Sequence, residues 1–220
     1  PIYHKLYVMV LIKVARDSGM PLSKEILGGE KGHKAEEFIL WVRTLIGKAC
    51  AWGMPLCFVK IDLKRAFALL KHVPVGRLLL QRGIPPYLVA AILREVSSHV
   101  TSLSLGDIVV GDISYTRGVA EGGPHSMYLL NCVVDDVLRR LVPQWRQQGL
   151  GFVLLNERRE NIVRPALAWV DDLVLAGQTT QGIEIMLDDL AAAIAAYGGE
   201  LAIDKLEWMK TPQTANGIIQ

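Results

Sequence analysis

Two adjacent aspartates, Asp171 and Asp172, lie between the short apolar runs at residues 167–170 and 173–177. Short runs rich in Val, Leu and aromatic residues that end at glycine are typical of strands, so we expect a β-hairpin with both acids at its turn. Successive strand residues point to opposite faces, and a turn is where two consecutive carboxylates can converge. Such carboxylates repel each other, and a divalent cation such as Mg²⁺ or Mn²⁺ relieves the repulsion. Taken by itself, the pattern fits a metal site and a solvated acidic turn equally well.

The composition indicates a folded globular chain. Its 220 residues suffice for one large domain or two small ones, and 51% hydrophobic with 21% charged residues argues against disorder. The net charge of +2 permits a nucleic-acid partner without arguing for one. The three cysteines have no CxxC spacing, which argues against a zinc site or a disulfide framework and suits a reducing compartment. No apolar run approaches the roughly 20 residues of a membrane span, so we expect no membrane partner.

Two features upstream of the hairpin carry candidate chemistry. Residues 56–61 predict a strand that ends on Asp62. An aspartate in that place is most often a helix N-cap or turn former, and the alternative is a metal ligand presented at the strand end. The glycine-rich loop at 117–126 leads into a helix with Pro124 near its first turn, and its backbone amides can hold phosphate. Many loops are rich in glycine for turn geometry only, so the loop by itself is a weak signal.

The remaining pattern predicts alternating helices and strands. We expect helices with one buried stripe at 3–16, 38–49, 129–141 and 183–194, a ribbon from 100–105 and 113–117, and strands at 151–155 and 162–168. Lys205 is expected on a final strand. Three carboxylates from two separate β elements can build a two-metal site, with ions about 3.5–4 Å apart, that drives in-line displacement at phosphorus.

Four segments in this order resemble the motifs of reverse transcriptase palms, most closely those of non-LTR (LINE-type) retroelements. The first is FVKIDLKRAF at 58–67, and the second is RGVAEGGPHS at 117–126, running on to Asn131. The third is WVDD at 169–172, and the fourth spans 199–209. The resemblance covers about residues 38–210, and four ordered motifs are far more specific than any one of them.

The resemblance implies a fold class and a domain organisation. The fold would be an α+β polymerase palm, an antiparallel sheet backed by helices, with partial fingers and no thumb. Residues 1–55 would form N-terminal helices and partial fingers, and 56–210 the palm with an inserted fingers segment at about 70–118. Residues 211–220 would begin a truncated following segment. The chain lacks an initiator Met, so we expect an excerpt from a longer polypeptide.

The resemblance also implies an activity, that of an RNA-directed DNA polymerase. This nucleotidyltransferase would extend a primer 3′-hydroxyl with the help of two Mg²⁺ or Mn²⁺ ions. The expected partners are an RNA template, a DNA primer, deoxynucleoside triphosphates and the rest of a larger retroelement polypeptide. The expected location is intracellular, in the nucleus or cytoplasm of a eukaryotic host. Group II intron-type and telomerase-like polymerases share this palm and are alternatives.

Carried over residue by residue, the resemblance assigns the catalytic groups. Asp62, Asp171 and Asp172 would hold the two metal ions, together with the main-chain carbonyl of Leu63. Lys205 would lie near the leaving pyrophosphate as a candidate general acid, and the competing interpretation is a solvated strand lysine.

Other residues would contact nucleotide or template. Phe67 would stack under the incoming sugar and exclude a 2′-hydroxyl, unless it is an ordinary core phenylalanine. Lys64 and Arg65 would contact phosphate, unless they form a solvated helix face. The loop residues that would be shaped against template and incoming nucleotide are Glu121, Gly122, Pro124 and Ser126.

Some positions depart from the family pattern. Ala68 stands where the family usually has Asp, and Trp169 where it usually has Tyr or Phe. Glu121 replaces the usual Gln and puts negative charge near the triphosphate, which weakens binding through repulsion. The alternative function is therefore a degenerate or domesticated palm, catalytically inactive, that binds nucleic acid or protein.

Overall fold

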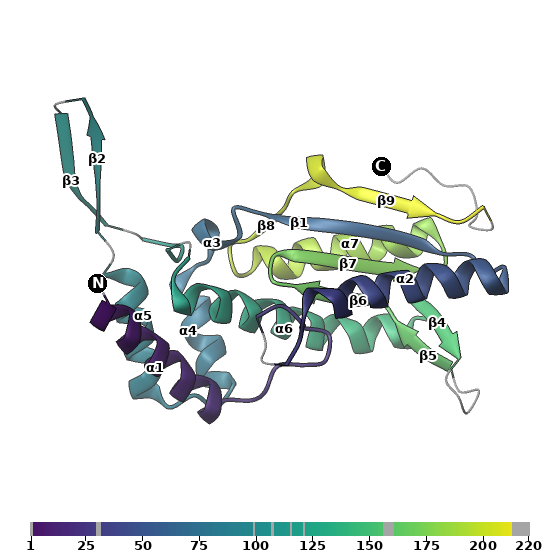
Figure 1. Cartoon of the computed structure of the whole chain (residues 1–220), viewed down its shortest axis with the longest axis horizontal. Coiled ribbons are helices and arrows are strands. Elements are labelled where there is room, and N and C mark those ends of the chain that lie inside the picture. Colours follow the sequence, from purple (N-terminus) through teal and green to yellow (C-terminus); the bar gives the residue numbers. More distant parts are fainter. Residues whose placement is uncertain are drawn as a thin grey trace.

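The computed structural model describes residues 2–212 except 30–31, 99, 107, 115, 121 and 156–160. The helices are α1 (Ile2–Ser18), α2 (Ala35–Trp52), α3 (Ala66–Leu69), α4 (His72–Gln81), α5 (Pro86–Ser97), α6 (Pro124–Gln147) and α7 (Thr180–Ala195), with a 3₁₀ turn η1 (Ile203–Lys205). The strands are β1 (Cys57–Lys64), β2 (Val100–Leu105), β3 (Ile108–Ser114), β4 (Phe152–Leu155), β5 (Asn161–Arg164), β6 (Ala166–Trp169), β7 (Asp172–Gly177), β8 (Glu200–Leu201) and β9 (Glu207–Lys210). Figure 1 shows their arrangement along the chain.

β1 is the central strand of a five-stranded antiparallel sheet with the order β6-β7-β1-β8, in which β9 also pairs with β1. Along one edge, β7 pairs with β1 from Cys57 opposite Gly177 to Asp62 opposite Asp172. Along the other edge, β9 pairs with the first half of β1, and β8 pairs with its last two residues. The α+β palm expected from the sequence is confirmed in this architecture.

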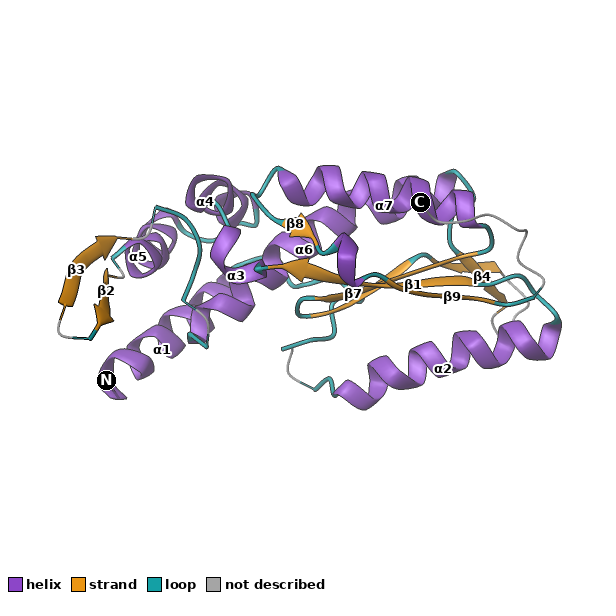
Figure 2. Ribbon diagram, turned by 90° about the horizontal axis from the view of Figure 1, so that it is seen from above, coloured by secondary structure: helices purple, strands orange, loops and turns teal. Residues whose placement is uncertain are grey.

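Side chains of β1 alternate between two environments because strand residues point to opposite faces. Every second residue from Cys57 to Leu63 is buried in the main core, whereas Phe58, Lys60 and Asp62 are half-buried. The buried face packs against α7 and α6, which lie together on one side of the sheet in Figure 2. Each large apolar side chain buried there contributes about 1.5–3 kcal/mol.

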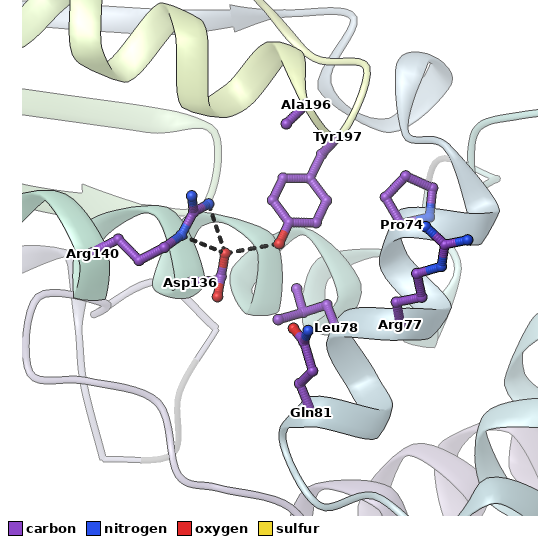
Figure 3. Close-up of a pocket in the computed structure, with 8 residues that line it drawn as sticks. All are labelled: Pro74, Arg77, Leu78, Gln81, Asp136, Arg140, Ala196 and Tyr197. Atoms are coloured by element: carbon purple, nitrogen blue, oxygen red, sulfur yellow. Dashed lines mark hydrogen bonds and ion pairs between the residues drawn. The ribbon is translucent and has the colours of Figure 1, made fainter.

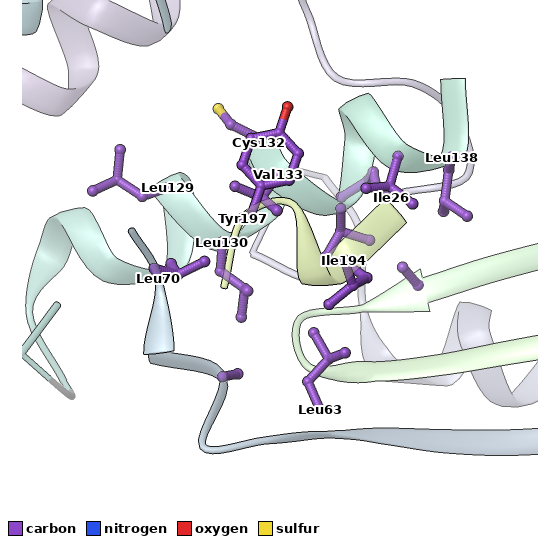
Figure 4. Packing of buried hydrophobic residues seen from close by; sticks show 14 of the residues in the cluster. Ile26, Leu63, Leu70, Leu129, Leu130, Cys132, Val133, Leu138, Ile194 and Tyr197 are labelled. Carbon is purple, nitrogen blue, oxygen red and sulfur yellow. The ribbon is translucent and has the colours of Figure 1, made fainter. Parts of the chain in front are cut away.

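α6 is the central helix of the main core. Pro124 occupies its first turn, as the sequence predicts, because proline has no amide proton to lose there. Its apolar stripe, which includes Leu129, Leu130 and Val133, is buried against Ile194 of α7 and Leu70 (Figure 4). The loop that leads into this helix is therefore fixed to the same core as the sheet.

α2 covers part of the opposite face of the sheet (Figure 2). Its Leu45 and Ala49 form a second apolar cluster with Phe152 and Ala176, and Phe58 packs against that cluster. This contact lies at the start of β1. The far end of the same face, which carries Asp62, stays partly open to solvent.

At the other end of the molecule, where the β2–β3 hairpin projects, α5 packs against α1 and α4, and α1 and α4 each pack against α6 (Figure 1). The division of the chain at residues 55 and 210 stays a prediction. Within the described residues, no helix is both long and apolar enough to cross a bilayer.

Three expected strands differ in their limits. The strand expected to end on Asp62 continues as β1 to Lys64, because Leu63 and Lys64 pair with β8. The ribbon partner expected at 113–117 runs instead from Ile108 to Ser114, so residues 111–112 belong to the strand and not to a loop. The chain reverses earlier, at Gly106, whose φ of 59° glycine adopts readily. The single strand expected at 162–168 is two strands, β5 and β6, separated by Pro165. Proline cannot donate to a strand ladder, which explains the break.

A buried ion cluster ties α4 and α6 to the segment after α1. Asp135 is fully buried, and its Oδ2 lies 2.5 Å from Nη1 of Arg82 and 2.8 Å from Nε of Arg139. Its Oδ1 accepts the backbone N–H of Ser23 at 2.7 Å. Burial would raise the pKa of Asp135, but the hydrogen bonds from Ser23, Arg139 and Arg82 outweigh it and hold the pKa below its usual value.

Because removing one member of a buried ion cluster leaves the others uncompensated, Asp135→Asn should lower the free energy of unfolding by about 3 kcal/mol. Urea denaturation followed by circular dichroism measures this. The matched control is Asp17→Asn, which breaks the exposed Lys13–Asp17 pair and should cost less than about 1 kcal/mol. Equal costs for the two variants would show that the Asp135 cluster does not anchor these elements.

Candidate active site

The hairpin expected from the sequence is present as β6 and β7, but only Asp171 lies in its turn, because Asp172 is already the first residue of β7. Trp169 pairs with Asp172, so Val170 and Asp171 form a two-residue connection. Val170 has a φ of 59°, which is rare for a β-branched residue and costs about 1–3 kcal/mol. The surrounding structure must therefore hold this turn in place.

The segment around Gly28 supplies that support, which the sequence reasoning missed. Leu27 donates its N–H to the carbonyl of Ala168 on β6 at 3.0 Å. Asn131 of α6 donates its side-chain amide to the carbonyl of Gly28 at 2.6 Å. A Cβ on Gly28 would lie only 2.4 Å from the backbone nitrogen of Val170, so only glycine allows this close approach. The only sequence signals were a glycine pair and the Asn that ends the second motif.

Asp62 and Asp172 are direct partners across β1 and β7. Side chains at opposed positions share one face, with Cβ atoms about 4.5–5.5 Å apart. Asp171 precedes Asp172 in the turn, and its pKa is raised first by burial and then by the negative charges of Asp172 and Asp62. The structure thus places Asp62 beside two acids that come more than a hundred residues later in the chain.

Two lysines neutralise part of this charge. Nζ of Lys205 donates to Oδ2 of Asp62 at 3.2 Å. Nζ of Lys60 lies 3.3 Å from Oδ1 of Asp172. The expectation of a strand at Lys205 is wrong, because this residue ends the 3₁₀ turn η1. The backbone N–H of Ala202 donates to the carbonyl of Asp62, and the chain turns back after that bond. Lys60 was not among the predicted site residues.

The donor set has the chemistry of a hard-cation site, because three carboxylates gather near one end of the sheet. Leu63, the fourth predicted ligand, follows Asp62 on β1 with its side chain in the core. In the described part of the chain, however, no three acidic, His or Cys side chains stand close enough to hold an ion in their present positions. Two of the carboxylates face ammonium groups instead.

The residues after Asp62 form a short bend into α3. Lys64 is exposed, with Nζ 3.4 Å from a carboxylate oxygen of Glu200. Arg65 is exposed and left-handed, with a φ of 47°, just before α3. Phe67 is half-buried and packs against the main core, and its carbonyl accepts the N–H of Val119 at 2.7 Å. That bond joins the first motif to the loop of the second.

The glycine-rich loop is braced by its own side chains. Gly122 has a φ of 75°, and Gly123 precedes the first residue of α6, Pro124. Ser126 donates its hydroxyl to the carbonyl of Ala120 at 2.5 Å, which closes the loop onto the helix. Glu121 lies outside the described residues.

A cavity of about 470 Å³ lies apart from these residues, between α4, α6 and the end of α7 (Figure 3). Asp136 accepts hydrogen bonds there from Arg140 and from the hydroxyl of Tyr197. Burial, and then the bond to Asp136, raises the pKa of Tyr197 to about 12, so the phenol stays protonated at neutral pH. The predicted site residues do not line this cavity.

Comparison with solved structures supports the fold. Apo telomerase from Candida tropicalis, truncated from its C-terminal domain, matches 98% of this chain and 41% of that chain, with a TM-score of 0.64 and 10% identity. Telomerase from Candida albicans in complex with a telomeric RNA fragment matches 96% of this chain and 36% of that chain, also with a TM-score of 0.64, at 11% identity. At such low identity the likeness shows the polymerase palm fold alone.

Comparison with known sequences identifies the family. The Pol polyprotein of a type-1 R2 retrotransposable element from Nasonia vitripennis is 30% identical over 141 residues, which are 64% of this chain and 13% of the relative. The R2DM polyprotein from Drosophila melanogaster is 28% identical over 150 residues, 68% of this chain and again 13% of the relative. A sequence model of reverse transcriptase (RNA-dependent DNA polymerase) matches residues 2–218. The chain therefore belongs to the reverse transcriptase family, as its four motifs predict.

Proposed function

We propose that this chain is the catalytic palm of a retroelement reverse transcriptase, which adds deoxynucleotides to a primer 3′-hydroxyl as an RNA template directs. The observation that carries the proposal is the pairing of Asp62 with Asp172 beside Asp171, at the solvent-open end of the sheet. In-line phosphoryl transfer needs such hard oxygen ligands and little covalent chemistry from the protein.

The carboxylates of Asp62, Asp171 and Asp172 and the carbonyl of Leu63 would hold two divalent cations, Mg²⁺ or Mn²⁺. When bound, the ions supply Lewis-acid activation of the 3′-hydroxyl and charge stabilisation of the leaving pyrophosphate. The chemistry of the donor set supports this assignment, since carboxylate and carbonyl oxygens suit both ions.

The other site residues would position the substrates. Lys205 already reaches the carboxylate of Asp62, so its ammonium is close enough to the site to give a proton to the pyrophosphate as it leaves. Phe67 would limit the space beside the sugar, and Lys64 and Arg65 would attract phosphate from their exposed positions. The loop around Glu121, Gly122, Pro124 and Ser126 would shape the contact with template and incoming nucleotide.

The partners would be an RNA template, a DNA primer and deoxynucleoside triphosphates. This chain spans 13% of the length of the two R2 polyproteins compared above, so the polypeptide around it would supply the parts that clamp the duplex. We place the protein in the nucleus or cytoplasm of a eukaryotic host, because those relatives come from insects.

The second candidate is an inactive palm that binds nucleic acid or protein. Ala68 and Glu121, which depart from the family pattern, favour it. The three preserved aspartates oppose it, because carboxylates that repel one another have no use on a surface that only binds polyanionic nucleic acid.

Divalent-cation binding separates the two candidates. Asp171→Asn should weaken Mn²⁺ binding by about tenfold or more, measured by calorimetric titration. Mutating even a residue that only supports a metal ligand typically lowers metal affinity by about 10–100-fold. Asp188→Asn, on the exposed side of α7 across the sheet, is the control and should leave the affinity unchanged. In the full polypeptide, Asp171→Asn should also abolish primer extension on an RNA template. Equal Mn²⁺ affinity in wild type and Asp171→Asn would remove the metal site from the proposal.

The sugar-discriminating role of Phe67 has a separate test. Phe67→Val should raise the ratio of ribonucleotide to deoxynucleotide incorporation by roughly tenfold, since a smaller side chain admits the 2′-hydroxyl. The ratio is measured in single-nucleotide extension with the full polypeptide, and it does not depend on how much of the variant is folded. An unchanged ratio would leave Phe67 as a core residue only.

The raised pKa of Asp171 gives a stability prediction. A folded-state pKa above the unfolded value means that the folded chain holds the proton more tightly, so stability falls as pH rises through the window between the two values. Asp171→Asn should therefore raise Tm in metal-free buffer at pH 7, by about 1 °C for a partly exposed group. The gain should shrink as the pH falls toward the ordinary value of 3.8. A lower Tm at pH 7 would contradict the raised pKa of Asp171.

A further inference from the structure

Lys60 lies on the same face of β1 as Asp62, two residues before it, and between two acids on neighbouring strands. On one side it reaches diagonally to Asp172 of β7, with 3.3 Å between Nζ and Oδ1. On the other side its direct partner in the sheet is Glu207 of β9. Both acids are within reach of a long, flexible lysine side chain, because diagonal and opposed neighbours on a sheet are close.

Only one of these acids is in use. In the described part of the chain, Glu207 makes no ion pair or hydrogen bond with its side chain, whereas Asp172 has the ammonium of Lys60. Glu207 and Lys60 together line an open cavity of about 230 Å³, with Phe58, Trp208 and Met209 on the same two strands. The space beside Glu207 is therefore free to receive a lysine head group.

We propose that Lys60 is a movable counter-ion of the carboxylate site: it neutralises Asp172 in the metal-free protein and transfers to Glu207 when a divalent cation takes Asp172. Lys60 then sets how tightly the site binds cations, and Glu207 lowers the cost of releasing Asp172. This inference rests on the proposed function, because it assumes that Asp172 is a cation ligand. It assigns a positioning role to two residues that lie within the first and fourth motifs but to which the resemblance gave no role.

The exchange accounts for the position of Lys60 between a paired acid, Asp172, and one that is unpaired among the described residues, Glu207. Asp62 and Asp172 face each other directly, and like charges in opposed positions destabilise a sheet. The ammonium of Lys60 compensates this repulsion while the site is empty, and Lys205 does the same for Asp62. When cations bring their own positive charge, a lysine that stayed beside Asp172 would repel them, so an acceptor for it is needed nearby.

Mn²⁺ affinity of the 220-residue chain, measured by calorimetric titration, tests the proposal. Lys60→Met should bind Mn²⁺ about fivefold more tightly, because the cation no longer competes with an ammonium at a solvent-exposed position. Lys60→Arg keeps the charge and should stay within twofold of wild type. The matched control is Lys13→Met, which removes the same charge from an exposed lysine that also pairs with an acid, Asp17, but on α1 and away from the sheet. It should change the affinity by less than twofold.

Glu207→Gln provides the second arm, and it keeps the test valid if Lys60→Met does not fold. This variant should weaken Mn²⁺ binding by about twofold, because the ammonium of Lys60 then has no second carboxylate to pair with when it leaves Asp172. In the double variant Lys60→Met/Glu207→Gln, the Glu207 change should have no effect of its own, and this non-additivity is the signature of a shared lysine.

Three results would overturn the proposal: Lys60→Met that binds Mn²⁺ no more tightly than wild type, equal tightening in Lys13→Met, or additive effects of the two changes in the double variant. If Asp171→Asn weakens Mn²⁺ binding while Lys60→Met changes nothing, the counter-ion role fails and the metal site stands. If Asp171→Asn also changes nothing, the proposed function fails first.

Discussion

The structure depends on how it keeps three negative charges together at one end of a sheet. Asp62 and Asp172 are fixed opposite each other by the β1–β7 register, and Asp171 precedes Asp172 in the turn. No backbone adjustment can separate the first two without breaking the ladder that holds the core. The fold tolerates them because this face is partly open to water and because two lysines provide opposite charge.

The turn itself is held from outside the sheet. Val170 has a backbone conformation that its branched side chain disfavours, and Gly28 packs directly against it. Asn131, from the helix that follows the glycine-rich loop, fixes Gly28 through its carbonyl. The second and third motifs are thus joined through a residue that belongs to neither, and a change at Gly28 reaches the acids without touching them.

Much of this arrangement could be predicted from the sequence, because the signals are local. The apolar runs on either side of Asp171 predicted the hairpin, and the apolar stripe after Pro124 predicted the buried face of α6. The pairing of distant strands could not be predicted from the sequence, because the partners of β1 lie about a hundred residues away or more. The ion pair of Lys60 with Asp172 could therefore not be predicted either. A lysine in a strand looks solvated until its neighbours are known. The expectation for Lys205 failed because a hydrogen bond to the distant Asp62 carbonyl, rather than the local pattern, sets the chain path there.

The central position of β1 also has a consequence for how the molecule is made. All three of its neighbours, β7, β8 and β9, come from the last fifth of the described chain, residues 172–210. During synthesis from the N-terminus, β1 therefore has none of its strand partners until more than a hundred further residues have been added. Pairings between such distant segments form slowly, and unpaired edges invite association with other chains. A ribosome-bound intermediate that ends before β7 is thus the species most in need of a chaperone.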